Sequence, residues 1–550
     1  MPGVSGGVTR RDFLKATACG VAISRSAIAQ PSRETLYNGI VLPAPWPPVR
    51  AEVSAEPQRP PYLISPPRTI NIDVGRQLFV DDFLIEDSSL YREFHRASYH
   101  AASPVLSPVT EWEHKDPHAL VTGDTPSATA MTFSDGVFFD PSDRLFKMWY
   151  MAGYQQQTAL AVSTDGIHWD RPSFDVVRGT NVVSTLSRDS GAVWLDAGDR
   201  EAPYKMTGYD LGTKSLRLQE SRDGIHWRTV GTTGPCGDRS TFFKNSFRDV
   251  FVFSLRHDDP LRIRTRQYVE SRRFPSTTWT AGQPVMWTGA DSADRARPEM
   301  PDTPRQLYNV DAVAYESVLL GLFAIYRGET AQREKPVDLC VAFSRDGFHW
   351  SRDFREPFIP VSERQGDWNW ANVQSAGGVC VVTGDQLYFY VSGRQGVPGT
   401  QLPGACSTGL ATLRRDGFAS VTDNWPSGAA RRIGQAPGLT TRPLVFTGKQ
   451  MFVNAEIDGD LRVEVLDRSG RVIDGFSADR CAPMRGGGTR LPVAWSGGAS
   501  LATLAGQAIR FRFVPTHARL YAFWVSQSDR GESAGYLAAG GPGYRTAKDV

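Results

Sequence analysis

The sequence predicts an all-β protein in which a five-bladed β-propeller is followed by a β-sandwich domain. A seven-residue motif, Ser-x-Asp-Gly-x-His-Trp, occurs at residues 163–169, 221–227 and 344–350. The copies start 58 and 123 residues apart, so the second interval is about two units. A period of this size, filled with short strand patterns, is typical of propeller blades. Fifty-two glycines and 37 prolines among 550 residues agree with many turns.

Each predicted unit has a short apolar strand followed by a second strand, which is often aromatic, and then the turn motif. Two degenerate copies of the motif, at 270–273 and 414–418, complete the series. The five strand pairs are 136–139 with 146–150, 192–195 with 204–206, 241–243 with 250–253, 312–315 with 320–323, and 378–382 with 387–390. A further strand pattern at 76–85 lies outside these pairs, and we expect it to close the ring against the last blade.

The repeated motif itself is best explained as structure. Asp-Gly is a hairpin-turn dipeptide, and the Trp can anchor packing between blades. His168, His226 and His349 occupy one repeat position on three blades. They cannot converge on one metal ion, so we expect them to be packing residues.

The first residues are expected to be an export signal. Residues 9–15 resemble the twin-arginine motif, and residues 27–29, Ala-Ile-Ala, form a small-x-small cleavage site before Gln30. We therefore expect a periplasmic or secreted protein with no membrane association after cleavage. The predicted boundaries are 1–29 for the signal peptide, 30–74 for a Pro-rich linker, 75–432 for the propeller, 433–528 for the sandwich and 529–550 for a flexible tail.

Composition and motifs exclude several classes of function. The 61 Lys and Arg residues nearly balance 59 Asp and Glu, so no nucleic-acid partner is expected. The sequence has no HExxH, P-loop, GxSxG or helix-opening GxGxxG motif. We expect no cofactor; a structural Ca²⁺ would find carboxylates here, although no loop has calcium-type spacing. The five cysteines beyond the signal lack metal-type spacing, and no disulfide pairing is indicated.

Candidate site residues lie just before the innermost strand of each blade, where the mouth of a propeller channel forms. These residues are Asp135, Asp189, Asp238, Asp311 and Gln374. Several carboxyl groups at one mouth could supply the acid and the base or nucleophile that glycoside cleavage needs. For any one Asp, capping of a turn is an equally simple explanation, and for Asp135 and Asp189 it is the simpler one, because each neighbours a loop of ordinary turn composition.

Glu316 is the preferred acid, paired with Asp311, because both stand in an apolar strand where an unpaired acid is costly. Asp238 is the third carboxylate, and Asp81, Asp82 and Asp116 are reserves. Residues that could bind substrate are Arg239, Arg256, Tyr308, Arg327, Trp370, Gln374 and Arg394. Trp368 with Trp370 could form a sugar-stacking platform or simply pack.

The chain resembles exported bacterial proteins called glycoside hydrolase family 32-like. The resemblance rests on residues 79–82, 146–150, the repeated Asp-Gly motif, 459–464 and 520–523, and it covers nearly all of the mature chain. It implies a five-bladed propeller with a C-terminal sandwich and a site of three carboxylates. The Asn-Asp-Pro-Asn-Gly, Arg-Asp-Pro and Glu-Cys motifs of invertase-type enzymes do not occur. Fructoside specificity therefore does not carry over.

Three functions remain open from the sequence. The first is an exported glycoside hydrolase acting on an oligo- or polysaccharide, either inverting or retaining. The second is a propeller that binds glycan without turnover, which the lack of invertase motifs favours. The third is a glycan phosphorylase or lyase on the same scaffold, which would show phosphate dependence or an unsaturated product.

Overall fold

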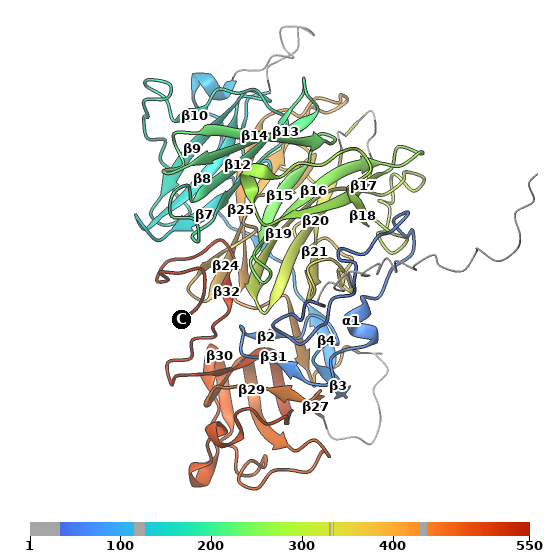
Figure 1. Cartoon of the computed structure of the whole chain (residues 1–550), viewed down its shortest axis with the longest axis vertical. Helices are drawn as coiled ribbons and strands as arrows, with labels where there is room; N and C mark the ends of the chain where they lie inside the picture. The colour runs from blue at the N-terminus through green and yellow to red at the C-terminus, as the bar shows by residue number, and fades with distance from the viewer. Residues whose placement is uncertain (1–32, 115–126, 329, 331, 334, 428–436) are drawn as a thin grey trace, which may run out of the picture.

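The computed structural model describes residues 33–114, 127–328, 330, 332–333, 335–427 and 437–550. The expected signal peptide at 1–29 and the reserve residue Asp116 lie outside this part. The described chain is nearly all β-structure, and its one α-helix, α1 (Pro61–Ile64), has four residues. No described helix has the length and apolar character needed to span a bilayer. Figure 1 shows the propeller strands in the upper part of the molecule and the sandwich strands β27, β29, β30 and β31 below.

Three antiparallel sheets follow one another along the chain, and the main strands of each pair in sequence order. The first is β6 (Ala130–Met131), β7 (Val137–Asp140), β8 (Leu145–Ala152), β9 (Gln157–Ser163) and β10 (Val182–Ser184), with β6 and β7 both on the inner edge. The second is β11 (Gly191–Leu195), β12 (Tyr204–Asp210), β13 (Ser215–Ser221) and β14 (Arg228–Pro235). The third is β15 (Thr241–Asn245), β16 (Val250–Asp258), β17 (Arg264–Ser271) and β18 (Val285–Thr288).

Two further strand groups share one continuous sheet because a single parallel bridge, Val337 to Asn372, joins them. One contains β19 (Gln306–Glu316), β20 (Val318–Tyr326) and β21 (Val337–Ser344). The other contains β22 (Asn372–Ser375), β23 (Val381–Thr383), β24 (Gln386–Arg394), β25 (Cys406–Arg414) and β5 (Ser98–Tyr99). Contacts run between the inner strands β7 and β11, β11 and β15, β15 and β19, and β23 and β7. The inner strands thus surround a common axis, as expected for a propeller.

The ring is closed by a different strand from the one predicted. Ser98 and Tyr99 of β5 pair with Thr412 and Ala411 of β25. The pattern at 76–85 instead contributes β2 (Gln77–Leu78), which pairs with the sandwich strand β31 (Arg510–Ser526). β5 is only two residues long, so no sequence pattern distinguished it as the closing strand.

The repeated motif forms turns as expected. In the first copy, Oδ1 of Asp165 accepts hydrogen bonds from the backbone N–H groups of Ile167 and His168 at 2.8 and 2.9 Å. The imidazole of His168 lies 2.7 Å from the other oxygen of Asp165, but its side chain is 85% exposed, so it supports the turn and is not the packing residue that was predicted. Gly166 has a φ of 77°, a left-handed value that glycine adopts at little cost. The indole of Trp149 donates to the carbonyl of Gly224 in the next copy at 2.8 Å, which ties adjacent blades together.

The sandwich draws on both ends of the described chain. Its strands are β2, β3 (Ile85–Ser88), β4 (Tyr91–Phe94), β26 (Ala419–Thr422), β27 (Leu439–Thr441), β29 (Gln450–Leu466), β30 (Met484–Pro492) and β31. Beside them β1 (Ile70–Asn71) pairs in parallel with β28 (Leu444–Val445). Short 3-10 turns are η1 (Glu111–His114), η2 (Phe274–Ser276), η3 (Ser496–Gly498) and η4 (Leu501–Leu504). The sandwich therefore includes residues that the predicted boundaries assigned to the propeller.

Two predicted connecting segments are packed against the body instead. Leu42, Tyr62 and Ile70, from the expected linker at 30–74, are buried in the sandwich core. In the expected flexible tail, β32 (Tyr536–Leu537) pairs with the end of β19, and Leu537 is fully buried. Proline and glycine content identified both segments as irregular, but irregular chain can still bury apolar side chains.

Candidate functional site

The innermost strands all begin at one face of the propeller, which we call the mouth. β19 runs from the mouth at Gln306 to the opposite, sandwich-facing end at Glu316. Because successive blade strands are antiparallel, the mouth also receives the ends of β8, β12, β16, β20 and β24. Side chains from these ends can converge there, whereas side chains at the opposite ends cannot.

A floor of hydrogen bonds closes the propeller axis below the mouth. The inner strands of the first and last blades meet there, with a parallel bridge between Gly136 and Gly377. A Cβ on Gly377 would lie 3.0 to 3.1 Å from three backbone carbonyl oxygens, so any larger residue would force the backbone to shift. Asp311 lies in this floor, where its Oδ2 accepts hydrogen bonds at 2.6 Å from the hydroxyls of Ser134 and Ser375.

Asp311 and Asp135 are consequently buried beneath the mouth and not exposed in it. Asp311 is 2% exposed and Asp135 is not exposed. Asp135 pairs with Arg188 at 2.7 Å, and burial raises its pKa in spite of that partner. The structure assigns both acids to the packing between blades, so their predicted direct catalytic roles are not supported by this geometry.

Asp189 and Asp238 are the two candidate carboxyl groups that remain partly exposed at the mouth. Asp189 accepts a hydrogen bond of 2.7 Å from the side-chain amide of Gln155. Burial and then the charge of Asp238 raise the pKa of Asp189, against the lowering effect of Arg239. Asp238, whose side chain is 43% exposed, forms an ion pair with Arg256. One mouth therefore holds two electrostatically coupled carboxyl groups in unlike surroundings.

Tyr209 lies within electrostatic reach of both carboxyl groups. Burial raises the pKa of its phenol to about 12, and Cys236, Asp238 and Asp189 add to that effect. Its hydroxyl therefore stays protonated and able to donate a hydrogen bond at neutral pH. This residue and Gln155 were not among the predicted site residues, because both stand at strand ends with no motif around them.

Two predicted arginines stack against one phenyl ring under the mouth. The guanidinium of Arg239 lies 3.8 Å from the ring centre of Phe133, and that of Arg394 lies 5.2 Å from it. Arg239 also donates through Nε to Oε1 of Gln374 at 2.6 Å, as expected for residues sharing the site. Phe133 itself was not predicted, because it lies in a stretch without strand alternation.

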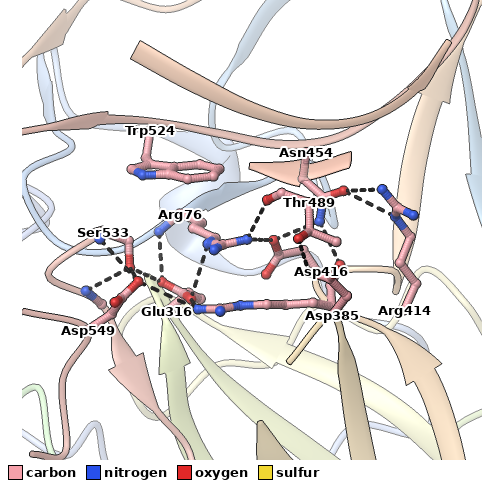
Figure 2. A network of polar contacts seen from close by, with 12 residues as sticks. Arg76, Glu316, Asp385, Arg414, Asp416, Asn454, Thr489, Trp524, Ser533 and Asp549 are labelled. Carbon is pink, nitrogen blue, oxygen red and sulfur yellow. Dashed lines mark hydrogen bonds and ion pairs between the residues drawn. The ribbon is translucent and has the colours of Figure 1, made fainter. Parts of the chain in front are cut away.

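Glu316, the preferred acid from sequence, is not at the mouth. It lies five residues beyond Asp311 on β19, about 16 Å along the strand. Its Oε1 is 2.9 Å from Arg415 and 3.5 Å from Arg76, and its Oε2 accepts 2.7 Å from Ser533. Figure 2 shows these contacts continuing through Asp416 to Asn454 of the sandwich. Glu316 is fully buried and belongs to this network between propeller and sandwich.

The other predicted binding residues divide between the mouth and the packing. Tyr308 is partly exposed and stacks near Arg264 at 5.0 Å. Trp370 is 7% exposed and packed against Arg333, so it offers no open platform. Arg327 is buried and pairs with Asp338 at 2.9 Å. Trp368 lies over Gly393 and Gly409, where a Cβ would approach its ring to 2.2 and 2.1 Å.

The two reserve acids that the structure describes, Asp81 and Asp82, are held in ion pairs. Asp81 is fully buried and holds Arg345 at 2.8 Å, and Asp82 pairs with Arg92 at 2.6 Å. The five cysteines in the described chain are free thiols. Among the described residues, no group of three or more His, Cys, Asp or Glu side chains is placed to hold a metal ion.

No protein-family model and no curated protein matches the sequence. Solved structures with similarity include an N-acetylgalactosamine deacetylase from F. plautii, at 14% identity and a TM-score of 0.40, covering 60% of this chain and 97% of that one. A thermostable family-43 glycoside hydrolase has 12% identity and a TM-score of 0.37, covering 56% and 99%. An exo-beta-1,3-galactanase from Phanerochaete chrysosporium has 10% identity and a TM-score of 0.35, covering 76% and 99%. At these identities, the reaction has to be argued from the residues of this chain.

Proposed function

We propose that the protein is an exported glycoside hydrolase that cleaves its carbohydrate substrate at the propeller mouth. The observation that carries the proposal is the pair of Asp189 and Asp238, which are coupled, partly exposed and differently surrounded. One carboxyl group whose protonated form is favoured, beside a second one held in an ion pair, is an arrangement that suits acid–base hydrolysis of a glycoside. The narrower likeness to family 32 remains part of this proposal.

Asp189 has the surroundings of the general acid. Burial and the neighbouring negative charge of Asp238 both favour its protonated form. The hydrogen bond from Gln155 to Oδ2 fixes the orientation of the carboxyl group. A proton held in this way can pass to the glycosidic oxygen as the bond to the leaving sugar breaks.

Asp238 has the surroundings of the second carboxylate. Its ion pair with Arg256 orients it at the mouth, and its exposure leaves an oxygen open to water or to the sugar. As base it would activate water, and as nucleophile it would attack the anomeric carbon. In either role its negative charge stabilises the positive charge that develops on the sugar in the transition state.

The proposed location is the periplasm or the outside of the cell, after removal of the signal peptide. It rests on the twin-arginine pattern at residues 9–15 and the Ala-Ile-Ala site at 27–29. The carbohydrate would then be met outside the cytoplasm.

The test is a screen of the chain from Gln30 against fructans, arabinans, mannans, galactans and uronic-acid polymers, with release of reducing ends as readout. On a substrate that is cleaved, Asp189→Asn and Asp238→Asn are each expected to reduce kcat by at least 10³-fold. Asp249→Asn is the control, because Asp249 is 78% exposed and pairs with Lys244 away from the mouth. Full activity of either mouth variant would refute the assignment.

The same screen separates the alternatives. If Asp238 is the nucleophile of a retaining enzyme, the sugar first released by the wild type should keep its anomeric configuration, and Asp238→Gly supplied with azide should form a glycosyl azide of inverted configuration. An inverting enzyme should release sugar of inverted configuration. Binding without release of sugar would favour a glycan-binding propeller. Dependence on phosphate, or an unsaturated product, would favour a phosphorylase or a lyase.

A further inference from the structure

Two arginines below the mouth are buried without a carboxylate partner. Arg239 is 2% exposed, Arg266 is fully buried, and neither has an Asp or Glu oxygen within ion-pair distance among the residues that the structure describes. Arg239 donates to the side chain of Gln374 and to the carbonyl of Phe133. Arg266 donates to Ser254 and to backbone carbonyls, including that of Arg239 at 2.9 Å. All of these acceptors are neutral.

The guanidiniums of Arg239 and Arg266 lie close enough to repel one another. Burial and then the charge of Arg239 lower the pKa of Arg266 to about 9, so it is still protonated at neutral pH. Asp311 is the acid with the strongest influence on both, and it is shared between them. Burying charge without a matching partner costs several kcal/mol, so folding alone does not explain the pair.

Arg239 also keeps an unused hydrogen-bond donor. Its Nη2 is buried and has no partner, although the guanidinium is fixed by Gln374 and by the ring of Phe133. Its backbone has a φ of 57°, a left-handed value that is strained for a non-glycine residue. A charge, a free donor and a strained backbone therefore coincide at one residue beside the proposed acid, Asp189.

We propose that the mouth recognises a sugar that carries a carboxylate, a uronic acid residue, with Arg239 as the group that binds this carboxylate. The inference rests on the proposed function, because it places that sugar between Asp189 and Asp238. A planar carboxylate matches the fork of a guanidinium and supplies the acceptor that Nη2 lacks. Since Nη2 is covered in this structure, binding requires rotation of a neighbouring side chain, a common adjustment at binding sites.

The negative charge of the bound sugar would also offset the positive charges of Arg239 and Arg266. With Asp189 protonated for catalysis, Asp311 is the carboxylate that still acts on both Arg239 and Arg266. A substrate carboxylate restores one negative charge next to the two cations. A neutral sugar would leave the positive excess in place and bind without this gain.

The first measurement is binding, which does not depend on turnover. Calorimetry would compare D-galacturonate and D-glucuronate with galactose and glucose, using Asp189→Asn to prevent any reaction. We expect at least one acid to bind ten-fold or more tightly than its neutral counterpart. Equal affinities for each pair, or tighter binding of a sulfated sugar than of both uronates, would overturn the inference.

The second measurement assigns the preference to Arg239. Arg239→Gln should lose the preference for the acid, so that the affinities for the acid and for its neutral counterpart become equal within about two-fold. Arg239→Lys keeps the charge and should retain part of the preference. Arg228→Gln, on the outer strand β14 with its side chain 76% exposed, removes the same charge away from the mouth and should change nothing. An equal loss for acid and neutral sugars in Arg239→Gln would mean a structural role only.

These results separate the two proposals. Preferential binding of the uronate without any cleavage would uphold the inference and refute the hydrolase. Cleavage of neutral glycans, with uronate-containing ones ignored, would uphold the hydrolase and refute the inference.

Discussion

Replacing Glu316 by Gln should destabilise the protein without impairing chemistry in the fraction that folds. Glu316 is fully buried between Arg76 and Arg415, and its carboxylate receives four polar contacts between 2.7 and 3.5 Å. Glutamine keeps the size and one oxygen but removes the charge. Both guanidiniums would then remain in a dry interface with one fewer partner.

The expected magnitude follows from what each arginine retains. Breaking a buried ion pair on one side typically costs 3–5 kcal/mol. Arg76 keeps Asp416 at 2.9 Å, and Arg415 keeps Asp549 at 3.6 Å, so we expect the lower end, about 3 kcal/mol. Glu356→Gln is the control, because Glu356 is 50% exposed and 3.5 Å from Arg96, a surface pair worth about 0–1 kcal/mol.

The assay is urea unfolding followed by fluorescence, together with kcat on any substrate that the screen identifies. The reasoning predicts a lower unfolding midpoint for Glu316→Gln and an unchanged kcat per folded molecule. If kcat fell 10³-fold while the unfolding midpoint stayed at the wild-type value, Glu316 would be the acid, as the sequence alone suggested.

Four other outcomes are expected. Since burial and then Asp238 raise the pKa of Asp189, kcat should fall as pH rises through that pKa; a rate that is flat through neutral and alkaline pH would contradict its role as acid. The stability linked to Asp189 should fall with rising pH over the same window, because the folded state holds the proton more tightly. Burial raises the pKa of Asp140, but hydrogen bonds from Lys147 and others outweigh it and lower that pKa to about 2. Asp140→Asn should therefore reduce the free energy of unfolding by about 2 kcal/mol at pH 7. Chemical denaturation should show that the difference from the wild type shrinks as the pH falls below 4. Gly377→Ala should reduce the free energy of unfolding by about 1–3 kcal/mol and lower the melting temperature, because the new Cβ would meet three carbonyl oxygens at 3.0 to 3.1 Å. An unchanged melting temperature would show that the backbone around Gly377 can shift.

The propeller could be predicted because its signal is local. Each Asp-Gly turn is made by hydrogen bonds within a few residues, such as those from Ile167 and His168 to Asp165, so the sequence pattern and the structure coincide. The closing strand could not be assigned in this way. β5 is two residues long and pairs with residues more than 300 positions away, and nothing near Ser98 announces that partner.

The site was predictable only as a set of candidates. The rule that acids precede innermost strands found Asp189 and Asp238, but it found Asp135 and Asp311 equally well. What separates them is the floor at Gly377, which depends on two blades meeting across the axis.

The sequence could not place Glu316 for a related reason. An acid inside an apolar strand indicates either catalysis or a buried ion pair. Its partners Arg76 and Arg415 lie 240 and 99 residues away in sequence, so the sequence could not distinguish these alternatives.

β5 and β2 pair with strands far along the chain, and this affects how the protein can fold during synthesis. Residues 77–99 leave the ribosome early, yet their strand partners in β25 and β31 follow hundreds of residues later. Neither the ring nor the sandwich can be completed until most of the chain has been made. The early strands would meanwhile expose unpaired edges, which are prone to wrong association. A fragment cut at residue 432 would also lack the partners of β2 and β3, which are β31 and β27, so the two parts of this molecule are best produced together.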